Sequence, residues 1–213
     1  MPASLPSLQP LLFRLLPPLC LTCRRAAPAA DVLLCERCDQ ALDALRPVRP
    51  IPPPGVTEAW SAAPHQGVAR NLVVALKFRR LLPAAIAAAE LIAERAPPAL
   101  LSERTVVPVP PAPLRRVWRG FDPAGEIASA LARLIDAPLS ACLSRRGSGH
   151  QRGRGRMERM ANAPRIEVDG LAPERPLLVD DVMTTGATLM TCAAAMRSTG
   201  ALDAKAITFT HEL

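Results

Sequence analysis

The stretch RPLLVDDVMTTGATL, residues 175–189, decides the fold that we expect for this chain. Its apolar run PLLV (176–179) is typical of a strand buried on both faces of a parallel sheet. Two carboxylates, Asp180 and Asp181, follow the run, and a turn rich in threonine and glycine comes after them. A helix is predicted next, because apolar residues recur at helical spacing until Gly200 stops the pattern. The residues of this stripe are Leu189, Cys192, Ala193 and Met196.

The order of strand, acids, turn and helix predicts a ligand site. In parallel sheets, ligands bind beyond the carboxyl ends of the strands, so we expect Asp180 and Asp181 just past the end of the strand. The backbone N–H groups at the start of the helix favour an anion, and Gly186 lets a ligand approach the backbone closely. Carboxylates instead accept hydrogen bonds from hydroxyls. A sugar phosphate with a vicinal diol, such as ribose 5-phosphate, satisfies both halves.

Two other phosphate-binding motifs are excluded by the same stretch. A Walker A loop requires a lysine directly after its last glycine, and a dinucleotide-binding turn requires three spaced glycines. Neither pattern occurs between residues 175 and 189. The phosphate donors are therefore expected in the turn itself, which consists of Thr184, Thr185, Gly186, Ala187 and Thr188.

A second motif lies near the N-terminus, where two C-x2-C pairs are separated by eleven residues. Four thiolates in two such pairs match the tetrahedral ligand set of Zn²⁺, and four protein ligands leave no position for a reacting water. We therefore expect a structural zinc site at Cys20, Cys23, Cys35 and Cys38. Cys142 and Cys192 have no such spacing and are predicted to be core residues.

The domain organisation follows from composition. The chain has 213 residues, 49% of them hydrophobic, which suffices for one α/β domain with a small appendage. We predict a four-cysteine zinc module at 1–45, a proline-rich linker at 46–58 that forms neither helix nor ladder hydrogen bonds, and a larger domain at 59–213. The net charge of +7 suits phosphate-bearing partners. The N-terminus lacks the features of an export signal, and no long uninterrupted apolar stretch occurs, so a cytoplasmic location is expected.

Further elements are predicted along the larger domain. RTVVPVP (104–110) and AKAITFT (204–210) are expected to be strands, and residues 69–96 carry a helical pattern. Asp122 is placed as the N-cap of a helix with Pro123 at its first position. The face of that helix is predicted to consist of Ile127, Leu131, Leu134 and Ile135. Residues 144–165, rich in arginine and glycine, are predicted to form a long exposed loop of functional importance. Strands alternating with helices predict a parallel sheet with flanking helices.

Residues 177–188 closely resemble the signature that binds phosphoribosyl diphosphate (PRPP) in type I phosphoribosyltransferases. That signature is an apolar run, two acids and a Thr-Thr-Gly-x-Thr turn. The resemblance implies a type I phosphoribosyltransferase-like sheet. It also implies that Asp180 and Asp181 hold the ribose hydroxyls while residues 184–188 bind the 5-phosphate.

The four-cysteine module together with this signature resembles the ComF family, whose founding members act in bacterial natural competence. The segments ALKF (75–78), VPVP (107–110), LRRVWRGFDPAGEIA (114–128) and HQRGRGRMERMAN (150–162) also look like segments of that family. The resemblance implies that the VPVP loop lies at the pyrophosphate position, where its prolines remove N–H donors. Side chains must then contact the diphosphate, and the candidates are Arg115, Arg116, Arg119 and Lys77.

The resemblance implies that residues 144–165 form a mobile hood over the reacting centre, with Gln151, Arg159 and Asn162 at family positions. PRPP would bind with Mg²⁺, and an unknown acceptor would displace pyrophosphate. The resulting expectation is a phosphoribosyltransferase of competence and DNA uptake or of nucleotide salvage.

Two alternatives remain open. One is a non-catalytic factor that senses PRPP or handles single-stranded DNA, with competence helicase machinery as a partner. The small number of aromatic residues argues against a dedicated groove for single strands. The other alternative is a zinc-dependent scaffold with a vestigial pocket. His65, His150 and His211 are isolated in the sequence, and no catalytic role is assigned to them.

Overall fold

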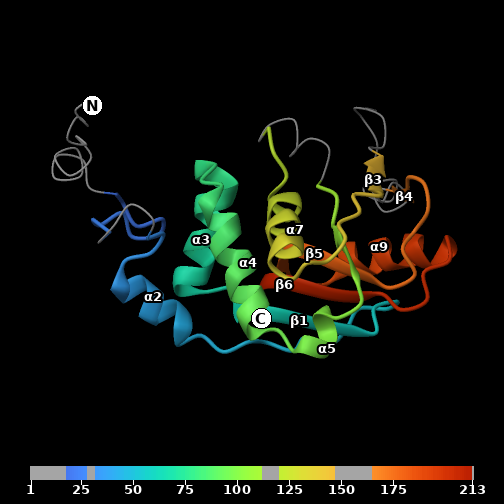
Figure 1. Ribbon diagram of the computed structural model, residues 1–213, viewed down its shortest axis with the longest axis horizontal. Coiled ribbons are helices and arrows are strands. Elements are labelled where there is room, and N and C mark those ends of the chain that lie inside the picture. Colours follow the sequence, from blue (N-terminus) through green and yellow to red (C-terminus); the bar gives the residue numbers. More distant parts are fainter. Residues whose placement is uncertain (1–17, 28–31, 112–119, 147–164, 213) are drawn as a thin grey trace, which may run out of the picture.

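The computed structural model describes residues 18–27, 32–111, 120–146 and 165–212. Within these ranges the centre of the protein is a four-stranded sheet in the order β1-β6-β5-β2 (Figure 1). Its strands are β1 (Glu58–Pro64), β2 (Thr105–Pro108), β5 (Pro176–Met183) and β6 (Lys205–His211). All neighbouring strands in this sheet are parallel. The predicted fold class, a parallel sheet with flanking helices, is confirmed.

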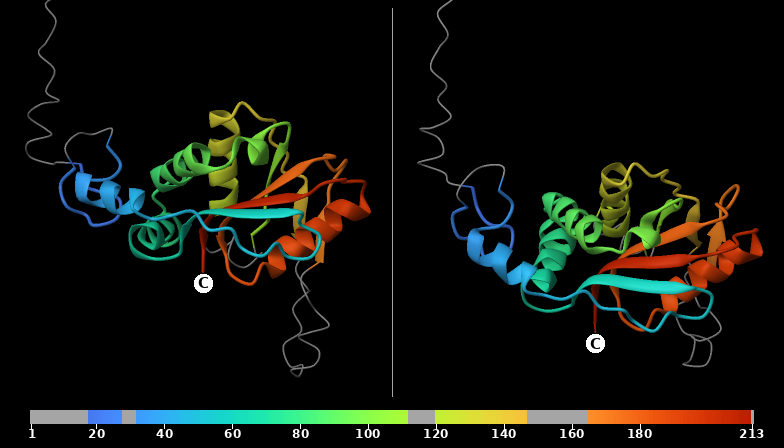
Figure 2. Two further views of the ribbon diagram at one scale, coloured as in Figure 1. Left: turned by 90° about the horizontal axis from the view of Figure 1, so that it is seen from below. Right: turned by 60° about the horizontal axis from the view of Figure 1, so that its bottom comes forward.

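Helices cover both faces of the sheet (Figure 2). One layer contains α3 (Gly67–Arg79), α4 (Pro83–Arg95) and α7 (Pro123–Leu134), and the opposite layer contains α9 (Ala187–Ser198). The short helix α5 (Pro98–Leu101) leads into β2. Two apolar clusters fill the spaces between the layers: one lies between the sheet and α3, α4 and α7, and the other lies between the sheet and α9. None of the helices among the described residues is long and apolar enough to cross a membrane.

Strand β5 is longer than predicted. The apolar run suggested an end at residue 179, but the strand continues to Met183 and includes both acids. The reason is the pairing with β6, in which Asp180 lies opposite Thr208 and Val182 opposite Thr210. Ladder hydrogen bonds from a neighbouring strand thus extend the strand through residues that have little strand preference of their own.

Strand β1 was not predicted at all. Its sequence EAWSAAP contains no β-branched residue, and its five central residues are buried regardless of side-chain polarity. The buried Ser61 is satisfied by a hydrogen bond between its Oγ and Thr208 Oγ1 at 2.6 Å. The strand is therefore stabilised by its neighbour, which a local pattern does not reveal.

The predicted helix after Asp122 is confirmed, with Asp122 at its N-cap and Pro123 in its first turn. One predicted face residue is wrong, because Leu134 is 51% exposed at the end of the helix while Ile127 and Leu131 are fully buried. The predicted loop at 144–165 is also wrong at both ends. Residues Leu143–Arg146 form β3 and Arg165–Val168 form β4, and these strands pair antiparallel.

The predicted linker packs against the larger domain. We call residues 46–57 the strap. The prediction that this segment makes no ladder hydrogen bonds is wrong at Val48, whose N–H and C=O both bond to Ser61 of β1, each at 2.9 Å. Pro53 and Val56 are buried. The boundaries predicted at residues 45 and 58 remain a prediction.

The four-cysteine region continues into helix α2 (Glu36–Asp43), which lies beside α3 and α4 (Figure 1). Cys20, Cys38 and Leu42 belong to the same apolar cluster as residues of those helices. Arg95 at the end of α4 donates hydrogen bonds to the carbonyl oxygens of Leu42 and Leu45 at 3.3 and 2.7 Å. These bonds fix the end of α2 to α4, and the Leu42 carbonyl also accepts a hydrogen bond from the Leu45 N–H at 3.1 Å.

Candidate functional site

The two adjacent acids lie in β5 and point to different sides of the sheet. Side chains alternate along a strand, so neighbours cannot share one face. Asp181 faces α3, where its Oδ2 lies 2.8 Å from Lys77 Nζ. Asp180 faces the α9 side, where its charge helps to raise the pKa of Cys192 to about 12, an effect due first to the burial of that thiol. Both acids nevertheless line one cleft.

Asp181 and Lys77 form an ion pair that is largely shielded from water. The exposed fractions of the two side chains are 10% and 17%. A carboxylate that loses water in this way needs a compensating cation, and Lys77 supplies it. Lys77, which the sequence suggested as a diphosphate contact, therefore already holds an acid of the cleft.

Asp180 is electrostatically different from its neighbour. Its Oδ1 accepts a hydrogen bond from the backbone N–H of Asp181 at 2.8 Å. Burial raises the pKa of Asp180 well above its usual range, and the charge of Asp181 raises it further. A buried acid with a raised pKa is a common feature of functional sites.

The turn after β5 opens the start of α9 toward solvent. Gly186 is the N-cap with a φ of 72°, a left-handed conformation that glycine adopts without strain. The first helical hydrogen bond runs from the Met190 N–H to the Gly186 carbonyl at 2.9 Å, so the amides before Met190 lie outside the helical ladder. Thr185 Oγ1 accepts only a long bond of 3.4 Å from the Ala187 N–H. The turn thus presents N–H and hydroxyl donors to a ligand.

A cleft of about 710 Å³ brings these groups together. Asp180, Asp181, Thr184 and Thr188 line it from β5 and the start of α9. Val182 and Glu212 also line the cleft. Further residues come from four places: the β1–α3 region, the end of β2, the start of α7, and β3. They are His65, Arg70, Val73, Val74, Lys77, Phe78, Val109, Pro110, Pro111, Asp122, Pro123, Ala124 and Arg145. The predicted turn residues Thr185, Gly186 and Ala187 lie next to the cleft without lining it.

The loop predicted at the pyrophosphate position also reaches the cleft. The Val109 N–H bonds to the Val179 carbonyl at 2.9 Å and so continues the ladder of β2. Pro110 and Pro111 follow at the cleft wall and contribute no N–H donors. The arginines predicted to supply charge there, Arg115, Arg116 and Arg119, lie outside the described residues, as do Gln151, Arg159 and Asn162 in the predicted hood.

Arg145 is a cleft residue that sequence reasoning missed. It extends from β3, and its Nε is buried without a hydrogen-bond partner among the described residues. A buried guanidinium nitrogen without a partner is costly, and an anionic ligand would satisfy it. The position is obscured in the sequence because Arg145 stands in a segment with many arginines.

His65 was also left without a role by the sequence, yet it lies at the cleft directly after β1. Its Nδ1 lies 2.8 Å from Thr210 Oγ1, and its pKa is lowered, mainly by burial. The only available sequence signal was its position after a strand, and that strand was not predicted.

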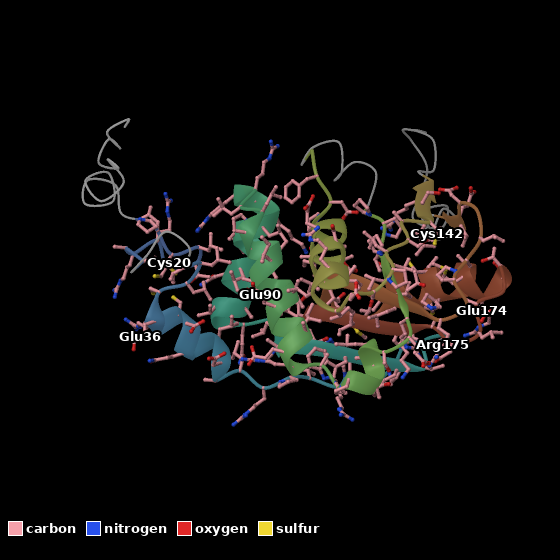
Figure 3. The ribbon with its side chains drawn as sticks, viewed as in Figure 1. Cys20, Glu36, Glu90, Cys142, Glu174 and Arg175 are labelled. Carbon is pink, nitrogen blue, oxygen red and sulfur yellow. The ribbon has the colours of Figure 1, made fainter. Side chains whose placement is uncertain are left out.

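The four predicted zinc ligands come together. All four sulfur atoms lie within 4.8 Å of one another, and the Cys23 and Cys35 sulfurs are 3.6 Å apart. Four sulfurs at about 2.3 Å from a tetrahedral Zn²⁺ are about 3.8 Å apart, so the cluster fits this ion. Figure 3 shows sulfur atoms gathered at Cys20 near the start of α2, with Cys142 toward the opposite end of the molecule.

The surroundings of the cluster also suit metal-bound thiolates. Burial opposes the thiolate of Cys20, but hydrogen bonds from Thr22 and from backbone groups lower its pKa to about 6. Burial raises the pKa of Cys38 to about 12. A bound cation would favour the thiolate form of both residues, so metal binding should release protons. Cys142 and Cys192 are buried apart from the cluster, as predicted.

Comparison with known proteins gave matches among solved structures only. No protein-family model matches the chain. No curated protein matches it either. An orotate phosphoribosyltransferase from Aeropyrum pernix shares 24% identity, with a TM-score of 0.40, over 62% of this chain and 63% of that one. The chain thus spans less than two thirds of the length of that enzyme.

Two further solved structures are similar over part of the chain. A purine phosphoribosyltransferase from Pyrococcus horikoshii Ot3 shares 20% identity, with a TM-score of 0.37, over 62% of this chain and 82% of that one. The UMP synthase of Leishmania donovani shares 18% identity, with a TM-score of 0.32, over 65% of this chain and 23% of that one.

Proposed function

We propose that this protein binds PRPP in the cleft between β5 and α3 and transfers its phosphoribosyl group to an acceptor. One observation carries the proposal: two adjacent acids and the open start of α9 line the same cleft. The acids suit the ribose hydroxyls, and the turn at 184–188 suits the 5-phosphate. The role in competence, DNA uptake or nucleotide salvage that the resemblance to the ComF family implies belongs to this proposal, as does a cytoplasmic location.

The cations of the cleft would serve different parts of the ligand. Lys77 Nζ lies 2.8 Å from Asp181 Oδ2 and compensates its charge, while the remaining lone pairs of the carboxylate can accept hydroxyl hydrogen bonds. Arg70 and Arg145 line the cleft and make no ion pair among the described residues. They are therefore suited to phosphate oxygens, in addition to the predicted Arg115, Arg116 and Arg119.

Two metal ions belong to the proposal. Zn²⁺ at the four cysteines would hold the N-terminal region in its fold and would take no part in the chemistry, because no coordination position remains open. Mg²⁺ would enter with the ligand, and the oxygens of Asp180 and Asp181 are donors of the kind that it prefers. When bound, Mg²⁺ would neutralise charge on the departing pyrophosphate.

The binding step is tested by calorimetry with PRPP and Mg²⁺. We expect binding to the wild-type protein and a loss of at least about tenfold in affinity for the Asp180→Asn/Asp181→Asn double variant. The matched control is Asp136→Asn/Asp169→Asn, which replaces two exposed acids that do not line the cleft. Unchanged affinity in the first variant would refute the assignment of the acids.

The transfer step needs a separate assay. Pyrophosphate release from PRPP is followed with a panel of nucleobases and amines, because the cleft does not identify the acceptor. Release with one acceptor supports a transferase. Tight PRPP binding without release under every condition would point to the non-catalytic sensor that the sequence left open.

A further inference from the structure

The strap ends in a tight turn at residues 53–56. The Val56 N–H donates a hydrogen bond to the Pro53 carbonyl at 3.0 Å, and Gly55 has a φ of 91°. Proline at the second position and a glycine with positive φ at the third are typical of a type II turn. The turn is anchored beyond its end, where the Thr57 N–H bonds to the Ala204 carbonyl at 2.9 Å. The turn is therefore fixed in place.

This turn packs along helix α9. A Cβ at Gly55 would lie 3.4 Å from the Ala193 Cβ and 2.9 Å from Arg197 Nη2, so the turn backbone comes close to the helix. Val56 lies in the same apolar cluster as Leu189 and Ala193. The strap thus covers part of α9, the helix whose start faces the cleft.

Pro53 reaches the N-cap of that helix. A Cβ added at Gly186 would lie 3.0 Å from the Pro53 Cβ and 3.1 Å from its Cγ. The proline ring is buried, while Thr184, Thr185 and Ala187 in the same turn are exposed. Two features therefore require glycine at position 186. Its φ of 72° strains other residues, and the ring of Pro53 leaves no room for a Cβ.

We infer that Pro53 is a positioning residue for the phosphate-binding turn, and this inference rests on the proposed function. The rigid ring holds Gly186 from one side, so that the N–H and hydroxyl groups of residues 184–188 keep one arrangement before the ligand arrives. Preorganisation of this kind increases affinity, because fewer groups must be ordered on binding. The ligand group concerned is the phosphomonoester of ribose 5-phosphate.

The first experiment measures ribose 5-phosphate binding by calorimetry, well below the melting temperature, for Pro53→Ala. We expect an affinity about fivefold to tenfold weaker than that of the wild type, because the variant keeps the Cβ but loses the Cγ beside Gly186 and the ring that fixes the backbone there. The control is Pro52→Ala, an exposed neighbour in the same strap, which should bind like the wild type. A merely structural proline would change the melting temperature but not the affinity of the folded protein.

The outcomes separate this inference from the proposed function. If the wild type binds neither PRPP nor ribose 5-phosphate, the proposed function is wrong and the inference falls with it. If it binds PRPP alone, the same comparison of Pro53→Ala with Pro52→Ala is made with PRPP. If the wild type binds and Pro53→Ala binds equally well, only the inference is overturned. A double-mutant cycle adds a rescue test. Gly186→Ala should abolish binding, because the new Cβ would meet the side chains of Pro53 and Met183. Pro53→Gly should restore part of the binding by removing the first of these two contacts. If the effects of the two substitutions on affinity were purely additive, the proposed contact between Pro53 and Gly186 would be contradicted.

A measurement on the wild type covers the case in which Pro53→Ala does not fold. The Val56 amide donates its hydrogen bond to the Pro53 carbonyl, so its hydrogen exchange reports on the strap turn. Ribose 5-phosphate should slow exchange at Val56 together with exchange in residues 184–188. Protection of the turn at 184–188 without any change at Val56 would overturn the inference.

Discussion

Lys77 Nζ lies 2.8 Å from Asp181 Oδ2, and both side chains are mostly buried. Asp180, directly before Asp181, has no such cation among the described residues, and its pKa is raised by burial. Two adjacent acids of the same type are thus placed in different electrostatic environments. This difference between the two acids leads to the first two predictions.

Replacing Lys77 by methionine should destabilise the protein. The change leaves the buried Asp181 carboxylate without its cation, which we expect to lower the free energy of unfolding by about 3 kcal/mol. The measurement is urea unfolding at neutral pH. The control is Lys205→Met, because Lys205 pairs with a Glu58 side chain that is 39% exposed and should lose only about 1 kcal/mol or less. Equal losses of unfolding free energy in the two variants would show that the burial of the Lys77–Asp181 pair adds nothing to its contribution.

Replacing Asp180 by asparagine should stabilise the protein at neutral pH. A raised pKa means that the folded protein binds a proton more tightly at Asp180 than the unfolded chain does. The stability that this proton contributes is therefore present below the unfolded pKa and lost as pH rises toward the folded pKa. Asparagine removes this pH dependence, and we expect a gain of about 1 kcal/mol at neutral pH.

Thermal unfolding of Asp180→Asn and the wild type at several pH values checks this prediction. The difference in melting temperature should shrink toward the usual aspartate pKa of 3.8, where the carboxyl group is protonated in both states. PRPP binding should weaken in the same variant, because the carboxylate is lost. If Asp180→Asn were less stable than the wild type at neutral pH, the Asp180 carboxyl group would make favourable interactions that outweigh its burial, and the prediction would be wrong.

If Zn²⁺ binds the four cysteines as proposed, its removal should destabilise the whole protein and not the N-terminal region alone. Cys20 and Cys38 share an apolar cluster with Leu72 and Leu76 of α3, so loss of their packing affects a common core. We expect a chelator to lower the melting temperature in a single transition. Mass spectrometry under native conditions should find one Zn²⁺ per chain in the wild type and none in Cys35→Ser. The control Cys142→Ala should keep its zinc, since Cys142 lies outside the cluster.

Replacing Arg145 by glutamine should weaken PRPP binding. The guanidinium lines the cleft with a buried, unpartnered Nε, and a lost hydrogen bond to a charged group corresponds to about tenfold or more in affinity. Calorimetry provides the measurement. Arg175→Gln is the matched control, because Arg175 pairs with the exposed Glu103 at the other end of β5. Equal affinity in the Arg145 variant and the wild type would exclude Arg145 from the ligand site.

Local patterns predicted the elements whose sequence agrees with their environment. The apolar stripe of α9 is correct, with Leu189, Cys192, Ala193 and Met196 all buried. The N-cap and first-turn proline of α7 are also correct. Strand β1 was missed because its small and polar residues are buried by neighbours far away in the sequence. The length of β5 was underestimated for the same reason, since pairing with β6 carries the strand through Asp180 and Asp181.

The candidate site was predicted in part. The acids and the Thr/Gly turn were predicted because they lie in one contiguous stretch of the sequence. His65 and Arg145 were missed because each is isolated in the sequence and reaches the cleft only through the fold. The partner of Lys77 was also not foreseen. The residues around Lys77 in the sequence do not show whether its ammonium group faces solvent or pairs with a buried acid.

The sequence by itself determined the properties that depend on neighbours along the chain: the cysteine spacing, the order of acids and turn after a strand, and the alternation of strands with helices. Only the tertiary structure decided which distant groups meet. The pairing of Lys77 with Asp181, the packing of Pro53 on Gly186 and the approach of Arg145 to the cleft are examples. The physical reason is that burial and charge compensation depend on the whole packed core, whereas spacing and turn chemistry depend on a few consecutive residues.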